Sequence, residues 1–180
     1  MPGIDPERPF RPLNIALLTV SDSRSPAEDR SGDLLAERLT KAGHWLADRA
    51  LVVDDAAKIA ARFRAWIADP AIDVVISTGG TGVTGRDVTP EALEQVAEKL
   101  IPGFGELFRL ISFNKIGTSA LQSRATAGVA GGTYLFALPG SPGACKDGWD
   151  EILAAQLDIR HRPCNFAELL PRLREHEIGR

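Results

Sequence analysis

Residues 73–87 read DVVISTGGTGVTGRD, and this stretch decides the fold that the sequence predicts. The apolar run 73–78 is typical of a short strand buried on both faces, as in a parallel sheet. Glycines follow directly, and a helix is expected soon after them. Thr89 is a favourable N-cap residue, and Pro90 suits the first helical position. Strand, glycine turn and helix form the repeating unit of α/β proteins.

The same alternation continues upstream of this stretch. A nearly continuous apolar run at 13–20 predicts another doubly buried strand, and a polar loop follows it. Leu35 and Leu39 mark the apolar face of a helix that Gly43 ends. We expect a short strand at 50–53, and then a second amphipathic helix that Pro70 ends, with Ile59, Phe63, Trp66 and Ile67 on its apolar face.

Downstream, the pattern predicts three more helices and a hairpin. The helix that begins near Pro90 should bury Leu93, Val96 and Leu100, and a further helix is expected at 103–113. Two strands, 127–129 and 133–138, flank two glycines and predict an antiparallel hairpin. The sequence LPGSPG then leads into a helix that reaches about residue 157.

These elements predict a three-layer α/β/α domain over residues 13–165, with a mostly parallel, doubly wound sheet. Residues 1–12 carry four prolines, so we expect an arm without strand or helix, which is either loose or anchored by Phe10. Residues 166–180 predict a C-terminal amphipathic helix packed on the same domain.

Composition narrows the function. The 180 residues hold 21 basic and 24 acidic side chains, and a net charge of −3 argues against a nucleic-acid partner. The two cysteines form no CxxC motif, which argues against zinc and a disulfide scaffold. The sequence contains neither an apolar run of about 18 residues nor a signal peptide. We therefore expect a cytoplasmic protein that does not enter membranes.

The carboxyl ends of parallel strands are where ligands bind in such sheets. Consecutive glycines there let backbone N–H groups converge on an anion, although a plain tight turn is the alternative. Two known motifs nearly match residues 80–87 and are rejected. The glycine spacing of a dinucleotide fingerprint follows the wrong strand and ends before the helix, and a Walker A would need a lysine and a hydroxyl where Arg86 and Asp87 stand.

Two aspartates at strand ends are candidate Mg²⁺ ligands. A carboxylate such as Asp87 beside a phosphate site repels phosphate unless a cation intervenes, and Mg²⁺ is the expected cation. Alternatively, Asp87 pairs with Arg86 or with the helix end. Asp54 and Asp55 end another strand, and at least one of them is expected to reach the same pocket, where we favour Asp54. The alternative is a cap of the next helix, which either residue could form.

Other polar residues near the strand ends are weaker candidates. Ser21 either binds ligand or caps a helix, and residues 139–143 (PGSPG) form a candidate second anion site. A polar cluster is a candidate pocket wall: Ser119, Gln122, Ser123 and Arg124. The three histidines and two cysteines are expected to be surface or packing residues.

Seven segments of the chain match a known family. They are TVSDSR (19–24), DRSG (29–32), GHWLADRALVVDD (43–55), STGGTGVTGRDVTPEAL (77–93), KLIPGFGELFR (99–109), IGTSALQSRATAG (116–128) and LPGSPGA (138–144). Together they resemble the MoaB/MogA family of molybdenum cofactor biosynthesis, and two of them, IPGFGELFR and IGTSALQSRA, resemble the MoaB branch. The match spans roughly residues 13–165.

This resemblance implies a molybdopterin-binding fold and Mg²⁺-ATP-dependent adenylylation of molybdopterin. By position, Asp54 and Asp87 match the family's functional acidic residues. The nucleotide and phosphate loop matches Gly79, Gly80, Thr81 and Gly82, and further pocket positions match Ser21, Pro139, Gly140 and Ser141. The resemblance also implies trimers or hexamers and partners in the same pathway. A non-catalytic oligomer that binds pterin or nucleotide is the alternative, while a nicotinamide-dependent reductase is rejected with the dinucleotide motif.

Overall fold

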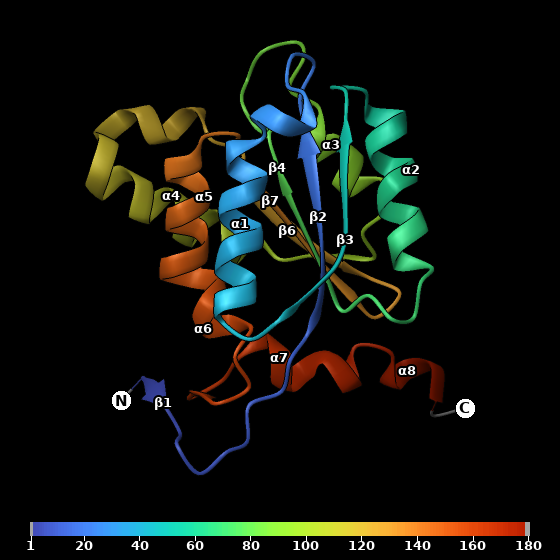
Figure 1. Cartoon of the computed structure of the whole chain (residues 1–180), viewed down its shortest axis with the longest axis vertical. Helices are drawn as coiled ribbons and strands as arrows, with labels where there is room; N and C mark the ends of the chain where they lie inside the picture. Colours follow the sequence, from blue (N-terminus) through green and yellow to red (C-terminus); the bar gives the residue numbers. More distant parts are fainter. Residues whose placement is uncertain (1, 179–180) are drawn as a thin grey trace.

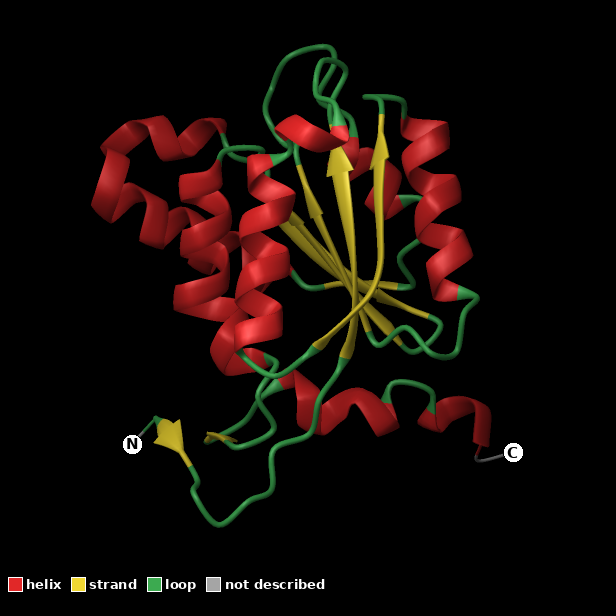
Figure 2. Cartoon of the chain, in the orientation of Figure 1, coloured by secondary structure: helices red, strands yellow, loops and turns green. Residues whose placement is uncertain are grey.

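The computed structural model describes residues 2–178, which form a central sheet with helices on both faces (Figure 1; Figure 2). The predicted three-layer α/β architecture is confirmed. The sheet has six strands in the order β3-β2-β4-β7-β6-β5. They are β2 (Asn14–Val20), β3 (Trp45–Val52), β4 (Val74–Thr78), β5 (Lys99–Leu100), β6 (Thr126–Ala130) and β7 (Thr133–Leu138).

Four strands of this sheet run parallel, and its far end is antiparallel. β3, β2, β4 and β7 pair in parallel, whereas β6 pairs antiparallel with both β7 and β5. The predicted hairpin is therefore correct. Gly131 and Gly132 form its turn, each with a positive φ, which glycine adopts without steric cost.

Alternate residues of each central strand enter two separate cores. In β2, Ile15 and Leu17 face one core and Ala16 and Leu18 the other, and all four are fully buried. The first core packs on α1 (Arg30–Lys41), α4 (Pro102–Ile116) and α5 (Pro142–Gly148). The second packs on α2 (Ala56–Ile67) and α3 (Thr89–Glu94), which Figure 1 shows on the opposite side of the sheet. This double burial is why the strands read as continuous apolar runs.

One predicted strand, β3, was too short, and one predicted helix, α3, was too long. β3 begins at Trp45, not residue 50: its first half is an exposed edge strand in which the apolar side chains of Trp45 and Leu46 are not buried, so the buried pattern used for the prediction starts later. α3 ends at Glu94, so Val96 and Leu100 are not on its face, and Leu100 belongs to β5. Thr89 is the first residue of α3 and its hydroxyl donates to Gly79 O at 2.8 Å, so it is not the predicted N-cap.

The helical segments after β7 and at the C-terminus are interrupted. α5 continues through a π-helical segment (Trp149–Leu153) into α6 (Ala154–Gln156). The predicted single helix over 166–180 is wrong. Short helices α7 (Phe166–Leu169) and α8 (Glu175–Ile178) flank a 3-10 turn, because Pro171 cannot continue an α-helix. Residues 179–180 of that prediction lie outside the described residues.

The N-terminal arm forms a small strand, contrary to the prediction. β1 (Gly3–Ile4) pairs antiparallel with β8 (His161–Arg162), between the prolines at 2 and 6 that we expected to prevent pairing. Phe10 anchors the arm: its ring lies 5.2 Å from that of His44. None of the helices in residues 2–178 has the length and apolar character needed to cross a bilayer.

The chain connections place a crevice at one edge of the sheet. After β2 the chain turns to α1 on one face, and after the adjacent β4 it leads to α3 on the other face. Figure 1 shows the two loops meeting above these strands. Such a divergence opens a ligand crevice at the carboxyl ends of the strands.

Candidate functional site

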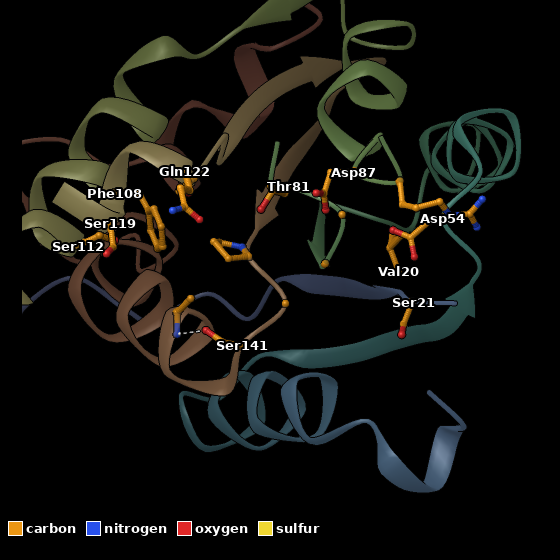
Figure 3. A pocket seen from close by; sticks show the side chains of 18 of the residues that line it. Val20, Ser21, Asp54, Thr81, Asp87, Phe108, Ser112, Ser119, Gln122 and Ser141 are labelled. Carbon is orange, nitrogen blue, oxygen red and sulfur yellow. Dashed lines mark hydrogen bonds between the residues drawn. The ribbon is translucent and has the colours of Figure 1, made fainter. Parts of the chain in front are cut away.

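A pocket of about 550 Å³ occupies this crevice. It is lined from the ends of β2, β4 and β7 and by residues of α4 and the 3-10 segment Gly117–Gln122. Figure 3 shows two ends: Asp54 and Asp87 lie near one, and Phe108, Ser112 and Ser119 near the other. Such a volume suits a small-molecule ligand.

Gly79 closes the sheet end so tightly that no other residue fits. Its N–H donates to Leu138 O at 3.0 Å, and its φ is +103°. A Cβ at this position would lie 2.1 Å from Val20 O. Gly79 therefore joins the ends of β2, β4 and β7, from which the pocket opens.

The next two backbone amides are available to a ligand. Among residues 2–178, the N–H groups of Gly80 and Thr81 donate to no other group, although both residues line the pocket. Converging, unpaired N–H groups bind anions. The glycine loop, which we define as residues 79–82, is therefore suited to a phosphate group, and the predicted residues Gly79, Gly80, Thr81 and Gly82 all line the pocket.

The structure separates the roles of the two adjacent aspartates. Asp55 is the N-cap of α2 and accepts from Lys58 N–H at 3.0 Å. Asp54 lines the pocket instead, as favoured from the sequence. Its partial burial and the nearby carboxylate of Asp22 raise its pKa, and the opposing effects of Arg86 and of a hydrogen bond from the Asp22 backbone do not cancel this rise.

Asp87 lies on the same pocket in a different environment. Its carboxylate accepts from the N–H and hydroxyl of Thr84, at 2.8 and 2.6 Å. Burial acts to raise its pKa, but the hydrogen bonds from Thr84 and the Gly82 N–H outweigh it and hold the pKa below its usual value. The alternative in which Asp87 pairs with Arg86 is not observed.

Arg86 pairs across the pocket mouth with Asp22. Its Nε donates to Asp22 Oδ2 at 2.7 Å, while Asp22 Oδ1 accepts from Asp54 N–H at 3.0 Å. The Arg86 hydrogen bond lowers the pKa of Asp22. This network links the loop after β2, the end of β3 and the segment after the glycine loop. Sequence reasoning missed Asp22, which had no signal beyond its place in a polar loop.

The oxygen ligands and charges of this end suit a hard divalent cation. Two guanidinium groups line the pocket, those of Arg24 and Arg86. Three carboxylates also line it, those of Asp22, Asp54 and Asp87, so the formal charge of the lining is 2 − 3 = −1. A polyphosphate therefore needs a cation to bind beside these carboxylates. Mg²⁺ prefers one or two carboxylates together with phosphate oxygens, which fits Asp54 and Asp87.

The other predicted candidates lie on the same pocket. Ser21 accepts from Arg24 N–H at 3.2 Å and so shapes its own loop, without capping α1. Ser141 caps α5 by accepting from Ala144 N–H at 3.2 Å, and Pro139 and Gly140 also line the pocket. Gly140 O accepts from the Ser31 hydroxyl at 2.7 Å, which fixes this loop against α1.

The far end of the pocket combines apolar and polar side chains. Phe108, Ile116 and Ala120 line it together with Ser119 and other serines. Of the predicted polar cluster, Ser119, Gln122 and Ser123 reach the pocket, whereas Arg124 does not and contacts Glu91. Phe108 was missed because its spacing predicts only a core position, and it is indeed 1% exposed.

The histidines and cysteines take no part in the site. His44 is buried and its Nδ1 accepts from Leu13 N–H at 3.1 Å, a packing role as predicted. Burial is the main cause that raises the pKa of the Cys145 thiol, to about 11, so it is not a nucleophile at neutral pH. No cluster of three or more metal-binding side chains occurs in the part of the chain that the structure describes.

Comparison with known proteins identifies the family. Residues 16–159 match the family described as "Probable molybdopterin binding domain". Molybdenum cofactor biosynthesis protein B of Escherichia coli K12 is 50% identical over 157 residues, which cover 87% of this chain and 92% of that protein. The protein of the same name from Staphylococcus carnosus is 42% identical over 155 residues, covering 82% and 88%.

Solved structures agree with this assignment. A crystal structure of molybdenum cofactor biosynthesis protein B superposes with a TM-score of 0.84 at 36% identity, covering 93% of this chain and 99% of that one. The tungsten cofactor synthesizing protein MoaB from Pyrococcus furiosus gives 0.74 at 33% identity, covering 91% and 98%. The chain therefore belongs to the molybdopterin-binding family of molybdenum cofactor biosynthesis proteins, with the B proteins (MoaB) among its relatives.

Proposed function

We propose that this protein adenylylates molybdopterin with Mg²⁺-ATP in molybdenum cofactor biosynthesis. The observation that carries the proposal is that one pocket holds both the loop N–H groups that have no hydrogen-bond partner and two carboxylates. The N–H groups of Gly80 and Thr81 are suited to phosphate, and Asp54 and Asp87 supply the acidic ligands beside it. Membership of the molybdopterin-binding family supports molybdopterin as the substrate.

The proposed reaction is a nucleotidyl transfer. An oxygen of the molybdopterin phosphate attacks the α-phosphorus of ATP, the bond from that phosphorus to the bridging oxygen of the β-phosphate breaks, and pyrophosphate leaves. The attacking group is already an anion, so no general base is needed, which agrees with the absence of a histidine from the pocket lining. The protein's contribution is alignment, which can lower the barrier by several kcal/mol.

The residues at the acidic end divide the work on the triphosphate. The loop N–H groups orient phosphate oxygens and stabilise developing negative charge. Mg²⁺, held by Asp54 and Asp87, would neutralise the triphosphate and stabilise charge on the pyrophosphate as it leaves. Arg86 is half of an exposed ion pair, so its guanidinium can exchange Asp22 for a phosphate.

The pterin occupies the far end of the pocket in this proposal. Ile116 offers an exposed apolar side chain, and Ser119 and Gln122 offer hydrogen-bonding groups that a flat heteroaromatic ring with amide and amine functions can use. The two ends of one cavity would then hold the two substrates with their phosphates towards each other.

We propose that the protein works as a homo-oligomer, a trimer or a hexamer. α4 carries four exposed apolar side chains, Leu107, Leu110, Phe113 and Ile116, and Leu121 in the 3-10 segment that follows is also exposed. Exposed apolar side chains gathered on one part of a folded domain mark a protein–protein contact. Analytical ultracentrifugation of the wild type and of Leu110→Glu tests it; a wild-type monomer at micromolar concentration would refute it.

The decisive assay follows both products. Purified protein is incubated with molybdopterin, ATP and Mg²⁺, and pyrophosphate release is measured together with the mass of the pterin product. We expect stoichiometric pyrophosphate and adenylylated molybdopterin from the wild type and neither from Asp87→Ala. Binding of both substrates without pyrophosphate release would contradict catalysis and support the non-catalytic alternative.

A further inference from the structure

Each of the four carbonyl groups of the glycine loop accepts a hydrogen bond from Thr89 or Arg124. Thr89 donates through its hydroxyl to Gly79 O at 2.8 Å and through its N–H to Gly80 O at 3.0 Å. The C=O and N–H of a trans peptide unit point in opposite directions. Fixing these two carbonyls therefore orients the N–H groups of Gly80 and Thr81, which are the unpaired donors of the pocket.

Arg124 holds the second half of the loop in the same way. Its backbone N–H donates to Thr81 O at 2.8 Å, and its Nε donates to Gly82 O at 2.6 Å. The same peptide geometry then directs the N–H groups of Gly82 and Val83 away from Arg124. The Gly82 N–H meets the carboxylate of Asp87, which it helps to keep ionised.

The Arg124 side chain also fixes Asp87 and the start of α3. Its Nη2 donates to Asp87 O at 2.7 Å, and both terminal nitrogens donate to the carboxylate of Glu91. These bonds occupy the guanidinium group with protein acceptors, and its nitrogens do not line the pocket. Arg124 therefore acts on a ligand only through the loop and Asp87.

The segment that carries Arg124 is itself anchored on α4. Arg109 Nη1 donates to Ala125 O at 3.0 Å. Gly105 lets α4 approach closely, since a Cβ there would lie 2.3 Å from Ala125 O. Arg124 thus extends from a fixed base, and movement of its guanidinium is limited.

We infer that Arg124 is a positioning residue for polyphosphate binding: it holds the glycine loop and Asp87 in the geometry that receives a Mg²⁺-polyphosphate. This inference rests on the proposed function and adds a residue outside the pocket to its machinery. Arginine is required because one planar group must donate to two backbone carbonyls and a carboxylate at once. A lysine can keep the charge but not all of these bonds.

Isothermal titration with inorganic tripolyphosphate and Mg²⁺ tests the inference without a need for catalysis. We expect R124M to weaken binding about tenfold or more, because the loop and Asp87 must then be ordered as the ligand binds, which costs binding free energy. R124K should fall between R124M and the wild type. E91Q leaves both carbonyl bonds in place and should weaken binding less than threefold. R38M is the matched control, because Arg38 makes a two-bond ion pair with Asp150 away from the pocket.

A melting curve for each variant and amide exchange at Val83 separate positioning from loss of fold. We expect R124K to remain folded with faster exchange at Val83 and weaker tripolyphosphate binding, whereas R38M should change neither. If R124M and R124K both bind tripolyphosphate within twofold of the wild-type affinity, the inference is overturned. The proposed function is not contradicted by that result. A wild type that binds neither tripolyphosphate nor ATP with Mg²⁺ would overturn the proposed function itself.

Discussion

Asp54 and Asp87 lie on one pocket, but their surroundings shift their pKa values in opposite directions. Asp87 receives hydrogen bonds from Thr84 and Gly82, which favour its ionised form. For Asp54, partial burial and the nearby carboxylate of Asp22 outweigh the favourable effects of Arg86 and of a hydrogen bond from the Asp22 backbone, so its pKa is raised. Asp87 is thus part of the loop's own structure, whereas the charge of Asp54 costs free energy in the folded protein, a cost that the proposed cation would offset.

This difference distinguishes a residue that shapes the site from one that serves the ligand. A raised carboxylate pKa at a pocket is a frequent mark of function, because folding alone does not favour it. Substitution of Asp54 should therefore damage activity without damaging stability, and substitution of Asp87 should damage both.

The largest expected effect is the loss of activity in Asp54→Asn. Removal of the charge that we propose binds Mg²⁺ should lower the rate of the proposed adenylylation about 10²-fold or more, while the melting temperature at pH 7 stays equal or rises. Steady-state kinetics and thermal unfolding provide the measurements. Asp55→Asn is the matched control, because asparagine still caps α2. Equal loss in both variants would contradict the assignment of Asp54.

The second largest effect on stability and binding is expected for Gly80→Ala. Gly80 has a φ of +66°, and a Cβ there would lie 2.4 Å from the Thr89 hydroxyl. We expect a loss of about 2 kcal/mol in unfolding free energy together with loss of Mg²⁺-ATP binding. Chemical denaturation and titration calorimetry measure the two effects. Gly85→Ala is the control, because a Cβ at Gly85 has open space around it, and this variant should change neither quantity. If Gly80→Ala binds Mg²⁺-ATP as tightly as Gly85→Ala does, the role of this loop is refuted.

Asp87→Asn should lower the unfolding free energy by roughly 1 kcal/mol at pH 7, because asparagine replaces charge-assisted hydrogen bonds to Thr84 with weaker ones. Urea denaturation at constant pH is the measurement. A stability equal to that of Asp54→Asn would remove the contrast between the two carboxylates.

The smallest effect is a difference in pH dependence. The pKa of Asp54 is raised on folding, so its contribution to stability is present below its unfolded pKa near 3.9 and is lost as pH rises through the folded value. The lowered pKa of Asp87 gives a contribution that is present above about pH 3.9 and lost as pH falls through its folded value. Relative to wild type, Asp54→Asn should therefore become more stable as pH rises above about 3.9, and Asp87→Asn should become less stable as pH rises towards about 3.9. Slopes of the same sign in urea melts would contradict the pKa assignment.

Much of the fold could be predicted because local signals and tertiary structure agree. The doubly buried strands are apolar throughout, and Gly43 and Pro70 lie where the helices before them end. The misses occur where tertiary contacts decide. The exposed half of β3 pairs only with β2, and the arm strand at Gly3–Ile4 exists through its partner at His161–Arg162.

The predicted site residues reached one pocket because the topology gathers the carboxyl ends of parallel strands. The choice between Asp54 and Asp55 needed the structure, since either could cap α2. Arg124 was placed in the pocket wall by its polar neighbours in sequence, whereas the bonds that occupy it become visible only when Gly82, Asp87 and Glu91 are located in space.

A crystal structure with Mg²⁺ and a non-hydrolysable ATP analogue tests the central claim most directly. We expect phosphate oxygens on the N–H groups of Gly80 and Thr81, and the metal ion between them and the carboxylates of Asp54 and Asp87. Triphosphate density at the Phe108 end of the pocket, or a metal ion that contacts neither aspartate, would contradict it.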